Sequence, residues 1–408
     1  MITIPVPESL LPQWIDGYAC YPSDTTDLVK VDLLFEAGSA YQPQLLCALA
    51  ANKLFSVASE EMDSTRTAEF MDYRGVVMET NNEVHQSTLT VYMLHRFAGE
   101  VLPVVGELLR RPAFDENDFA VWCDKQRQEI AANEQRTSSV ARKLYYETLF
   151  GAKHPLGWHA TVADVDKLDL ATVRAYYRKH YRTEECRVVL SGRVDEEITS
   201  LVAKHIGRGK DGQPLGLTLS AGLAHPQKRS LQHLDKSVQT TLRIGRVLPL
   251  CWDDPDYARL MLLTTLLGGY FGSRLMSNLR EDKGYTYGIY SRMQIYRGCN
   301  VFYITTDVAN DMADNAEKEI MRELERLDSI DEEELLLVKQ VMAGDFVRSV
   351  DGVFERSERY CNMLATGVTE QLTANLREAV NETTAAQLQE LARRLLNVAD
   401  MTVCRVGV

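Results

Sequence analysis

Two side chains within residues 267–288, LGGYFGSRLMSNLREDKGYTYG, carry groups that could bind or polarise a polar ligand. Arg280 carries a guanidinium group, which can grip a peptide carbonyl or a carboxylate through its fork of N–H groups. Tyr287 carries a phenol, which can donate a hydrogen bond to a developing oxyanion. The alternative is that Arg280 is a solvated helix residue and Tyr287 a half-buried strand residue, as isolated residues of these types usually are.

The elements expected around this pair would bring the two side chains together. The pattern predicts a short helix over about residues 273–281, a break at Gly284 and a strand from Tyr285. Arg280 would lie at the end of the helix and Tyr287 on the strand after the turn. Both side chains could then reach a common point.

Three glycines, Gly268, Gly269 and Gly272, precede the expected helix. Glycine lets the backbone turn tightly or come close to a ligand, so we assign these three to substrate binding. A phosphate-binding loop is the other interpretation of such a run. It would require G-x-x-x-x-G-K-[ST], which is absent, and the preceding segment has a helical pattern.

A zinc-binding motif of the usual metallopeptidase type is absent from the sequence. No two histidines are four residues apart, so neither H-x-x-E-H nor H-E-x-x-H occurs. The histidines are His85, His95, His154, His159, His180, His205, His225 and His233. His85 and His95 could share a face of a strand, with Glu60, Glu61, Glu129 and Glu134 as further acids, but scattered His and Glu are common on surfaces. We therefore expect no metal ligands in this chain.

The chain divides into two halves that are alike in outline. Each half opens with an alternating strand followed by an apolar helix, and closes with an amphipathic helix and a final strand. The expected elements are 29–35, 45–57, 170–181 and 186–190 in the first half, and 240–244, 257–267, 385–396 and 401–406 in the second. Capping boxes are expected at Ser329 and, with Gln387, at Thr384. The pattern indicates a duplicated domain rather than a solenoid.

The boundary between the halves is expected in residues 207–227, GRGKDGQPLGLTLSAGLAHPQ, which are rich in Gly and Pro. This linker would separate an N-terminal domain, 1–206, from a C-terminal domain, 228–408. Strands are grouped and helices are grouped, without regular alternation. The expected class is therefore α+β, with each domain a largely antiparallel or mixed sheet with helices packed on one face.

Composition narrows the possible partners and the compartment. The formal net charge of −13 argues against nucleic acid and anionic membranes, which bind basic patches, and is compatible with peptides. The eight cysteines form no C-x-x-C motif and fit a reducing compartment. We see no signal peptide and no apolar run long enough to span a bilayer, so a cytoplasmic protein is the expectation.

Residues 267–288 closely resemble the C-terminal-half signature of the pitrilysin/insulinase family of zinc metallopeptidases. The similarity is strongest to its short-subunit branch, which includes mitochondrial processing peptidase and bacterial relatives. It extends over nearly the whole chain, through His154-Pro155-Leu156-Gly157, His180-Tyr181 and Val188-Val189-Leu190-Ser191-Gly192. The resemblance implies that Arg280 and Tyr287 lie across a chamber from a zinc site, contact the substrate backbone and stabilise the tetrahedral intermediate.

Active members of that family carry H-x-x-E-H on the helix after their first strand, where this chain reads ALAANKLF at residues 48–55. The resemblance thus implies a non-catalytic subunit with no cofactor of its own, paired with a homologous zinc-bearing subunit around a peptide substrate. A strand near residues 87–94, expected at a sheet edge, could add substrate as a further strand in related active chains. Two alternatives stay open: a structural subunit with no part in proteolysis, and a self-associating homodimer with an unrecognised metal site.

Overall fold

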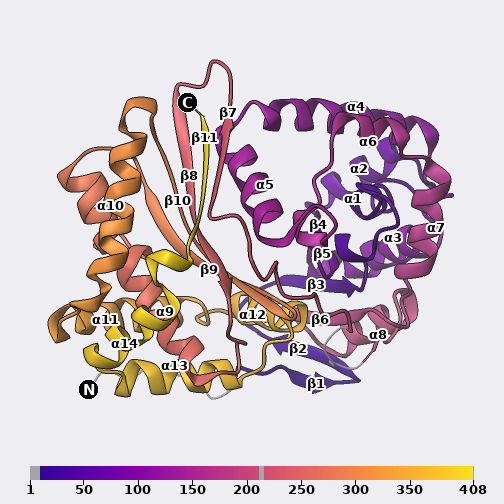
Figure 1. Cartoon of the computed structure of the whole chain (residues 1–408). Helices are drawn as coiled ribbons and strands as arrows, with labels where there is room; N and C mark the ends of the chain where they lie inside the picture. Colours follow the sequence, from indigo (N-terminus) through magenta and orange to yellow (C-terminus); the bar gives the residue numbers. More distant parts are fainter. Residues whose placement is uncertain (1–9, 211–215, 408) are drawn as a thin grey trace.

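The computed structural model describes residues 10–210 and 216–407, which form two lobes, each built on one β-sheet (Figure 1). The first sheet has the strand order β1-β2-β6-β3-β5-β4, and the second has the order β7-β11-β8-β10-β9. The strands are β1 Gln13–Ile15, β2 Tyr18–Pro22, β3 Leu28–Phe35, β4 Val77–Asn82, β5 Ser87–Leu94, β6 Arg187–Gly192, β7 Arg229–His233, β8 Gln239–Leu248, β9 Ile289–Tyr296, β10 Cys299–Ala309 and β11 Thr402–Gly407.

Apart from β1, the two sheets have the same topology. In each, one outer pair of strands, β2 with β6 or β7 with β11, is parallel, and the other neighbours are antiparallel. The expected α+β class, with two similar domains built on mixed sheets, is confirmed. The shared strand order is what a duplicated domain predicts.

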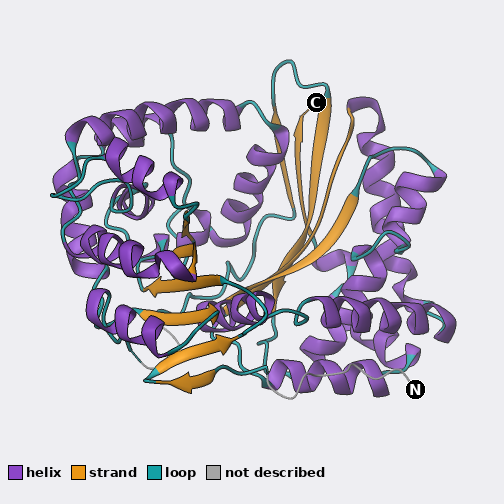
Figure 2. Cartoon of the chain, turned by 180° about the vertical axis from the view of Figure 1, so that it is seen from behind, coloured by secondary structure: helices purple, strands orange, loops and turns teal. Residues whose placement is uncertain are grey.

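Helices pack against each sheet (Figure 2), and those on one face come from the same half of the chain as the strands (Figure 1). The helices are α1 Cys47–Leu54, α2 Ser64–Tyr73, α3 Ala98–Arg110, α4 Glu116–Glu134, α5 Thr137–Phe150, α6 Val162–Lys167, α7 Leu170–His180, α8 Glu196–His205, α9 Pro255–Gly268, α10 Ala313–Glu325, α11 Glu332–Arg348, α12 Val353–Thr366, α13 Gln371–Glu382 and α14 Ala385–Leu395. Two separate apolar cores lie beneath these layers.

Each half also lends one helix to the sheet of the other half. Helix α5 packs against β8 and β11, where the hydroxyl of Tyr145 donates a hydrogen bond to the carbonyl oxygen of Phe302 at 2.7 Å. Helix α12 packs against β2, β3 and β6 and covers the buried ion pair between Lys30 and Asp32, whose Nζ and Oδ2 atoms are 3.2 Å apart. Figure 1 shows α5 beside the second sheet and α12 beside the first.

The positions of most expected elements agree with the structure. The opening strands are β3 and β8, and the closing elements are α7 with β6 and α14 with β11. The capping box of Thr384 and Gln387 is present at α14. The one expected at Ser329 is wrong, because Asp331 caps α11 by accepting a hydrogen bond from the N–H of Glu334 at 2.8 Å.

The segment 87–94 is not an edge strand, so this prediction is wrong. It forms β5, which is hydrogen-bonded to β3 on one side and to β4 on the other. The edge is β4, whose mostly polar sequence, VMETNN, has little of the apolar alternation that marks a strand.

The expected linker, 207–227, contacts both halves where the structure describes it; residues 211–215 lie outside the described ranges. The N–H of Leu219 donates to the carbonyl oxygen of Arg297, and that of Leu223 donates to the carbonyl oxygen of Leu149. Among the described helices, none is long and apolar enough to cross a bilayer.

Candidate functional site

Arg280 and Tyr287 line the same hollow, which has a volume of about 670 Å³. It lies at the end of the second sheet where β8 begins and β10 finishes. Its lining residues are Val238, Gln239, Arg280, Glu281, Gly284, Tyr285, Thr286, Tyr287, Asp307, Val308 and Ala309. The structure thus places the two side chains around one space.

The local backbone differs from the expected helix and strand. Residues Met276–Asp282 form a π-helix, and the strand begins at Ile289, four residues later than Tyr285. Gly284 breaks the helix with φ of +64°. The hydroxyl of Thr286 shares its hydrogen between the carbonyl oxygens of Gly288 and Asp307, which accept at 2.9 and 2.8 Å. These bonds hold residues 285–288 as a loop against the end of β10, so Tyr287 projects from a loop rather than from a strand.

Tyr287 is among the most exposed large side chains of the described chain, at 93% exposure. A tyrosine in that position adds almost nothing to the core, so its ring and hydroxyl are free to meet another molecule. Phe271, which is also exposed, lies nearby in the sequence and contacts Arg280. The surface therefore combines apolar rings with a hydrogen-bond donor.

The Arg280 side chain is partly exposed and held by two contacts. Its guanidinium carbon lies 4.9 Å from the centre of the Phe271 ring, and its Nε atom is 3.3 Å from Glu281 Oε1. Both contacts are at the surface, so each contributes little energy to the fold. The remaining N–H groups can reach an acceptor in the hollow.

The three glycines assigned to substrate binding do not line the hollow. Gly268 ends α9, and a Cβ atom there would lie 2.7 Å from the backbone nitrogen of Ser291 in β9. A Cβ at Gly269 would lie 2.5 Å from Thr265 Cα, and one at Gly272 would lie 2.9 Å from the Tyr270 ring. These positions show close packing between α9, the following turn and β9. The assignment to substrate stays a prediction.

Helix α1 lies where active members of the resembled family carry H-x-x-E-H, but its residues do not fit a zinc ion. Ala48 and Ala51 of α1 are fully buried and offer no ligand atom. Asn52 Oδ1 already accepts a hydrogen bond from the hydroxyl of Tyr181 at 3.0 Å. Cys47 is buried, which raises the pKa of its thiol to about 12 and disfavours the thiolate that binds metal.

The alternative metal ligands suggested by the sequence are not brought together. His85 is buried just before β5, whereas His95 follows β5 and lies 2.8 Å from Asp195 Oδ2. Glu60 and Glu61 lie in the connection between α1 and α2 rather than in a helix, and Glu129 and Glu134 are in α4. The structure therefore does not support a metal site built from these two histidines and four glutamates.

One small cluster of potential ligands was missed from the sequence. His95, Asp195 and Glu197 have ligand atoms within 4.8 Å of one another. Asp195 also caps α8 by accepting a hydrogen bond from the N–H of Ile198 at 3.0 Å, so a structural role already explains its position. His95 is 100 positions from Asp195 along the chain, and no motif links it to the two acids.

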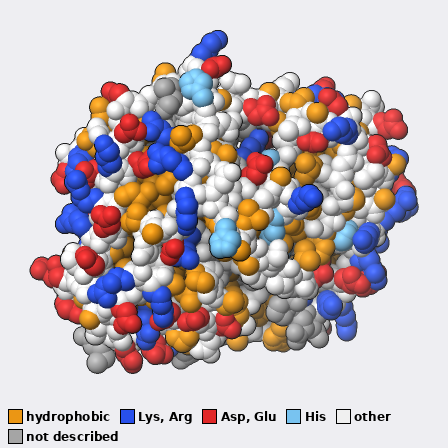
Figure 3. Space-filling model, viewed as in Figure 1, with side chains coloured by type: hydrophobic (Ala, Val, Ile, Leu, Met, Phe, Trp, Pro, Cys, Tyr) orange, Lys and Arg blue, Asp and Glu red, His pale blue; other side chains and the backbone are white. Residues whose placement is uncertain are grey.

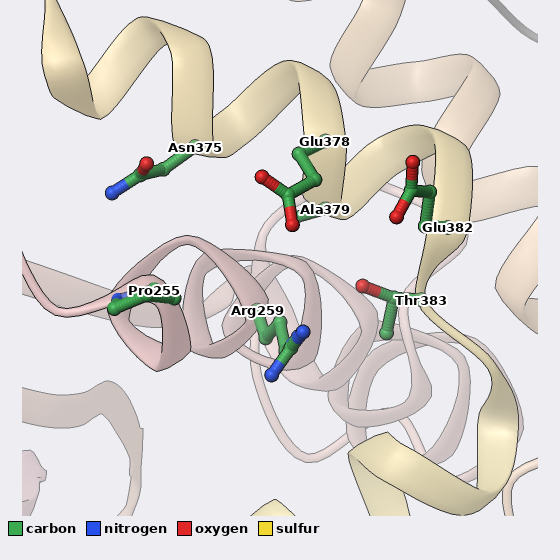
Figure 4. A pocket seen from close by; sticks show the side chains of 7 residues that line it. All are labelled: Pro255, Arg259, Asn375, Glu378, Ala379, Glu382 and Thr383. Carbon is green, nitrogen blue, oxygen red and sulfur yellow. The ribbon is translucent and has the colours of Figure 1, made fainter.

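A second, much smaller pocket lies between α9 and α13 (Figure 4). Arg259 points into it from α9, and Asn375, Glu378 and Glu382 from α13. Its volume of about 10 Å³ is enough for about one water molecule, so it is no substrate site. On the face seen in Figure 3, acidic and basic side chains are interspersed and form no continuous basic stripe.

Residues 167–342, which include Arg280 and Tyr287, match the family profile described as "Peptidase M16 inactive domain". By this match, residues 167–342 form a domain of the M16 peptidase family. The resemblance to the pitrilysin-like family is thus confirmed at the level of the family. The short-subunit branch and the subunit type remain predictions.

Proteins similar to this chain include several named as zinc proteases. The "Uncharacterized zinc protease Rv2782c" of Mycobacterium tuberculosis is 24% identical over 364 residues, covering 82% of this chain and 79% of that one. The "Uncharacterized zinc protease YmxG" of Bacillus subtilis is 23% identical over 358 residues, covering 84% and 83%. The "Non-peptidase homolog YmxG" of Helicobacter pylori is 22% identical, covering 64% and 61%.

Solved structures share the fold over almost the whole chain. The M16 inactive domain from Pseudomonas fluorescens superposes with a TM-score of 0.82 at 22% identity and covers 97% of each chain. A protease from Helicobacter pylori superposes with a TM-score of 0.83 at 16% identity, covering 98% of this chain and 99% of that one. The two-lobed α+β architecture is therefore that of M16 proteins.

Proposed function

We propose that this chain is the non-catalytic subunit of a two-subunit zinc metallopeptidase. It binds the peptide substrate and completes the active site of a homologous, zinc-bearing partner. The observation that carries the proposal is the pairing of an exposed Tyr287 with Arg280 on one hollow, in a chain whose α1 has no zinc ligand.

The chemistry of the two side chains suits a supporting role. The partner would supply the metal and the nucleophilic water, and this chain would supply groups that hold the peptide. The guanidinium of Arg280 binds a peptide carbonyl oxygen, and the phenol of Tyr287 donates to the oxyanion that forms during attack.

The open edge of β4 supports peptide binding by the same chain. In the described part of the sheet, β4 pairs with β5 alone. The N–H and C=O groups on its other side therefore form no hydrogen bonds with a neighbouring strand. An extended peptide can satisfy such groups by pairing as a further strand. The edge strand that was expected at 87–94 is thus replaced by β4 as the candidate.

The decisive experiment combines the purified chain with a homologous chain that carries H-x-x-E-H. Hydrolysis of a mixed set of quenched fluorescent peptides is measured for each chain alone and for the mixture, with and without a chelator. We expect turnover only in the mixture, with loss on chelation. Chelator-sensitive turnover by this chain alone would instead support the homodimer and direct attention to His95, Asp195 and Glu197.

A second candidate is a structural subunit with no part in proteolysis. It is favoured by the relative named as a non-peptidase homolog, which has 22% identity to this chain. The double variant Arg280→Gln/Tyr287→Phe separates the two functions. If the complex assembles and its peptidase rate is unchanged by the double variant, the structural role is correct and the proposed function is not.

A further inference from the structure

Where the two lobes meet, five buried or partly buried side chains carry polar atoms whose hydrogen-bonding capacity is not fully used by the described residues. These atoms are Tyr41 Oη, His85 Nδ1, His180 Nε2, and the Nε and Nη1 atoms of Arg187 and of Arg297. We call these five residues the junction cluster. Buried polar atoms are almost always hydrogen-bonded in proteins, so a group of unpaired ones calls for an explanation.

Contacts link the members of the junction cluster to one another. The ring centres of Tyr41 and His180 are 5.6 Å apart, and Nε2 of His85 accepts a hydrogen bond from the backbone N–H of Arg297 at 3.1 Å. Burial raises the pKa of Tyr41, and the positive charges of Arg297 and Arg187 act in the opposite direction.

The cluster draws on both lobes of the molecule. Arg187 begins β6 and pairs with Leu34 of β3, on the face that α12 covers. Arg297 lies in the turn between β9 and β10, and His180 ends α7. A ligand that contacts all of these groups would therefore join the first half of the chain to the second.

Within the described ranges, the two arginines face fewer negative charges than positive ones. Arg187 is 3% exposed and Arg297 is 6% exposed, and in the described ranges no ion pair joins either one to a carboxylate. Arg297 Nη2 donates to the carbonyl oxygen of Leu364 in the last turn of α12, where the helix end carries partial negative charge. The other nearby acid is Glu36, whose Oε1 accepts from the N–H of Gly216.

Among the residues that the structure describes, the two buried guanidinium groups thus face one carboxylate and one helix end. A buried cation without a full counter-charge is strongly unfavourable, and burial lowers the pKa of both arginines. The unpaired N–H groups and the Tyr41 hydroxyl are donors of the kind that bind oxyanions. A small anion would satisfy both the charge and the hydrogen bonds.

We propose that the junction cluster binds a small tetrahedral oxyanion of the phosphate or sulfate type. Arg187, Arg297 and Tyr41 donate hydrogen bonds to it, and it ties the lobes together. The site is distinct from the Arg280 and Tyr287 hollow, because the two lie at opposite ends of the eleven-residue strand β10. At about 3.3 Å per residue, that separation is roughly 35 Å.

The test uses inorganic phosphate as the probe and sodium chloride at equal ionic strength as the reference. Calorimetric titration of the intact chain should show one phosphate bound per chain. At saturating phosphate the melting temperature should rise by about 2–5 °C over the chloride reference. Sulfate should compete with phosphate, whereas acetate, which is planar, should compete poorly.

Variants distinguish a site from a general salt effect, because phosphate and sulfate also stabilise proteins by exclusion from their surfaces. Arg187→Gln and Arg297→Gln should abolish the titration signal and the phosphate-specific rise. Tyr41→Phe removes one hydroxyl and should weaken binding about 3- to 10-fold. The matched control is Arg243→Gln, since Arg243 is another buried arginine but stacks on Tyr303 in the second sheet.

The Arg243→Gln variant should be less stable than the parent chain and keep the full response to phosphate. Absence of saturable phosphate binding to the unaltered chain would overturn the proposal. So would an equal temperature rise in the parent chain and in Arg187→Gln. If the arginine variants do not fold, Tyr41→Phe decides, because unchanged affinity in that variant contradicts the proposed ligand set.

Discussion

Nε2 of His85 accepts a hydrogen bond from the backbone N–H of Arg297 at 3.1 Å, and this bond joins the β4–β5 turn of one sheet to the β9–β10 turn of the other. An imidazole that accepts through Nε2 must be neutral and carry its proton on Nδ1. Burial, reinforced by the charge of Arg297, lowers the pKa of His85 to about 4.

Stability is therefore expected to fall between pH 6.5 and 4. In the unfolded chain a histidine titrates near pH 6.5, so within this window the unfolded chain binds a proton that the folded chain does not. The contribution of neutral His85 to the free energy of unfolding is fully present above pH 6.5 and is lost as the pH falls toward 4. We expect a loss of about 3 kcal/mol at most, measured by urea unfolding at several pH values.

The control for this pH effect is His85→Gln, whose amide oxygen can accept the same hydrogen bond but does not titrate. Burial also lowers the pKa of His180, so part of the acid sensitivity should remain in the variant. The difference in unfolding free energy between parent and variant should shrink as the pH falls. A constant difference from pH 7 to pH 4 would show that His85 does not titrate as described.

Removal of the Tyr145 hydroxyl should loosen the contact of α5 with the second sheet. Tyr145→Phe leaves the carbonyl oxygen of Phe302 without this buried donor, at a cost of about 1–2 kcal/mol in urea unfolding. The matched control is Tyr73→Phe, which alters a ring that is 86% exposed and should change stability little. Equal effects of the two variants would mean that the Tyr145 bond contributes nothing specific.

Lys30→Met should destabilise the region under α12 because it leaves the Asp32 carboxylate buried without its cation. Nζ of Lys30 lies 3.2 Å from Asp32 Oδ2 and 3.5 Å from Glu358 Oε1. The expected cost is about 3–5 kcal/mol in chemical unfolding. The double variant Lys30→Met/Asp32→Leu should recover most of it, and a double variant as unstable as the single one would contradict this account.

Gly268→Ala should destabilise the chain through a clash rather than through loss of substrate. The new methyl group would lie 2.7 Å from Ser291 N and 2.9 Å from Ser291 Oγ, so α9 or β9 must shift. Overpacking of this kind costs about 1–3 kcal/mol. Gly99→Ala is the matched control, because Gly99 lies in α3 with open space around it and should gain about 0.5–1 kcal/mol. A stable Gly268→Ala protein with impaired peptide binding would favour a direct substrate role.

Tyr287→Phe should lower the activity of the two-chain peptidase without affecting the fold. Loss of one donor to an oxyanion typically costs about 100-fold or more in rate, so we expect kcat/KM to fall by at least about 10-fold. The melting temperature should stay the same because the side chain is almost fully exposed. Tyr290→Phe, on β9 and outside the hollow, should leave the rate unchanged. Equal rates for parent and Tyr287→Phe would remove Tyr287 from the proposed mechanism.

The sequence was sufficient for the parts of the fold that depend on local patterns. Alternating apolar residues identified β3 and β8, and the Thr384 capping box identified the start of α14. The motif of residues 267–288 also predicted that Arg280 and Tyr287 could meet, and both line the hollow. These features depend on neighbours that are close along the chain.

The parts that could not be predicted depend on distant contacts. The bond from Tyr145 to Phe302 spans 157 positions, and that from His85 to Arg297 spans 212. The loop that carries Tyr287 is held by Asp307 of β10, which no pattern around residue 287 reveals. The junction cluster is likewise invisible in the sequence, because its arginines are separated by 110 residues and share no motif.

The exchange of α5 and α12 between the sheets restricts how the molecule can move. If the lobes swung apart, α5 would leave Tyr303 and Arg243 facing water, and α12 would uncover the Lys30 and Asp32 pair. The contacts of α5 and α12 therefore oppose a hinge motion between the two halves. Any enclosed space that it forms with a second chain must then open and close at the contact between the chains, which makes that contact the point where entry of a peptide is controlled.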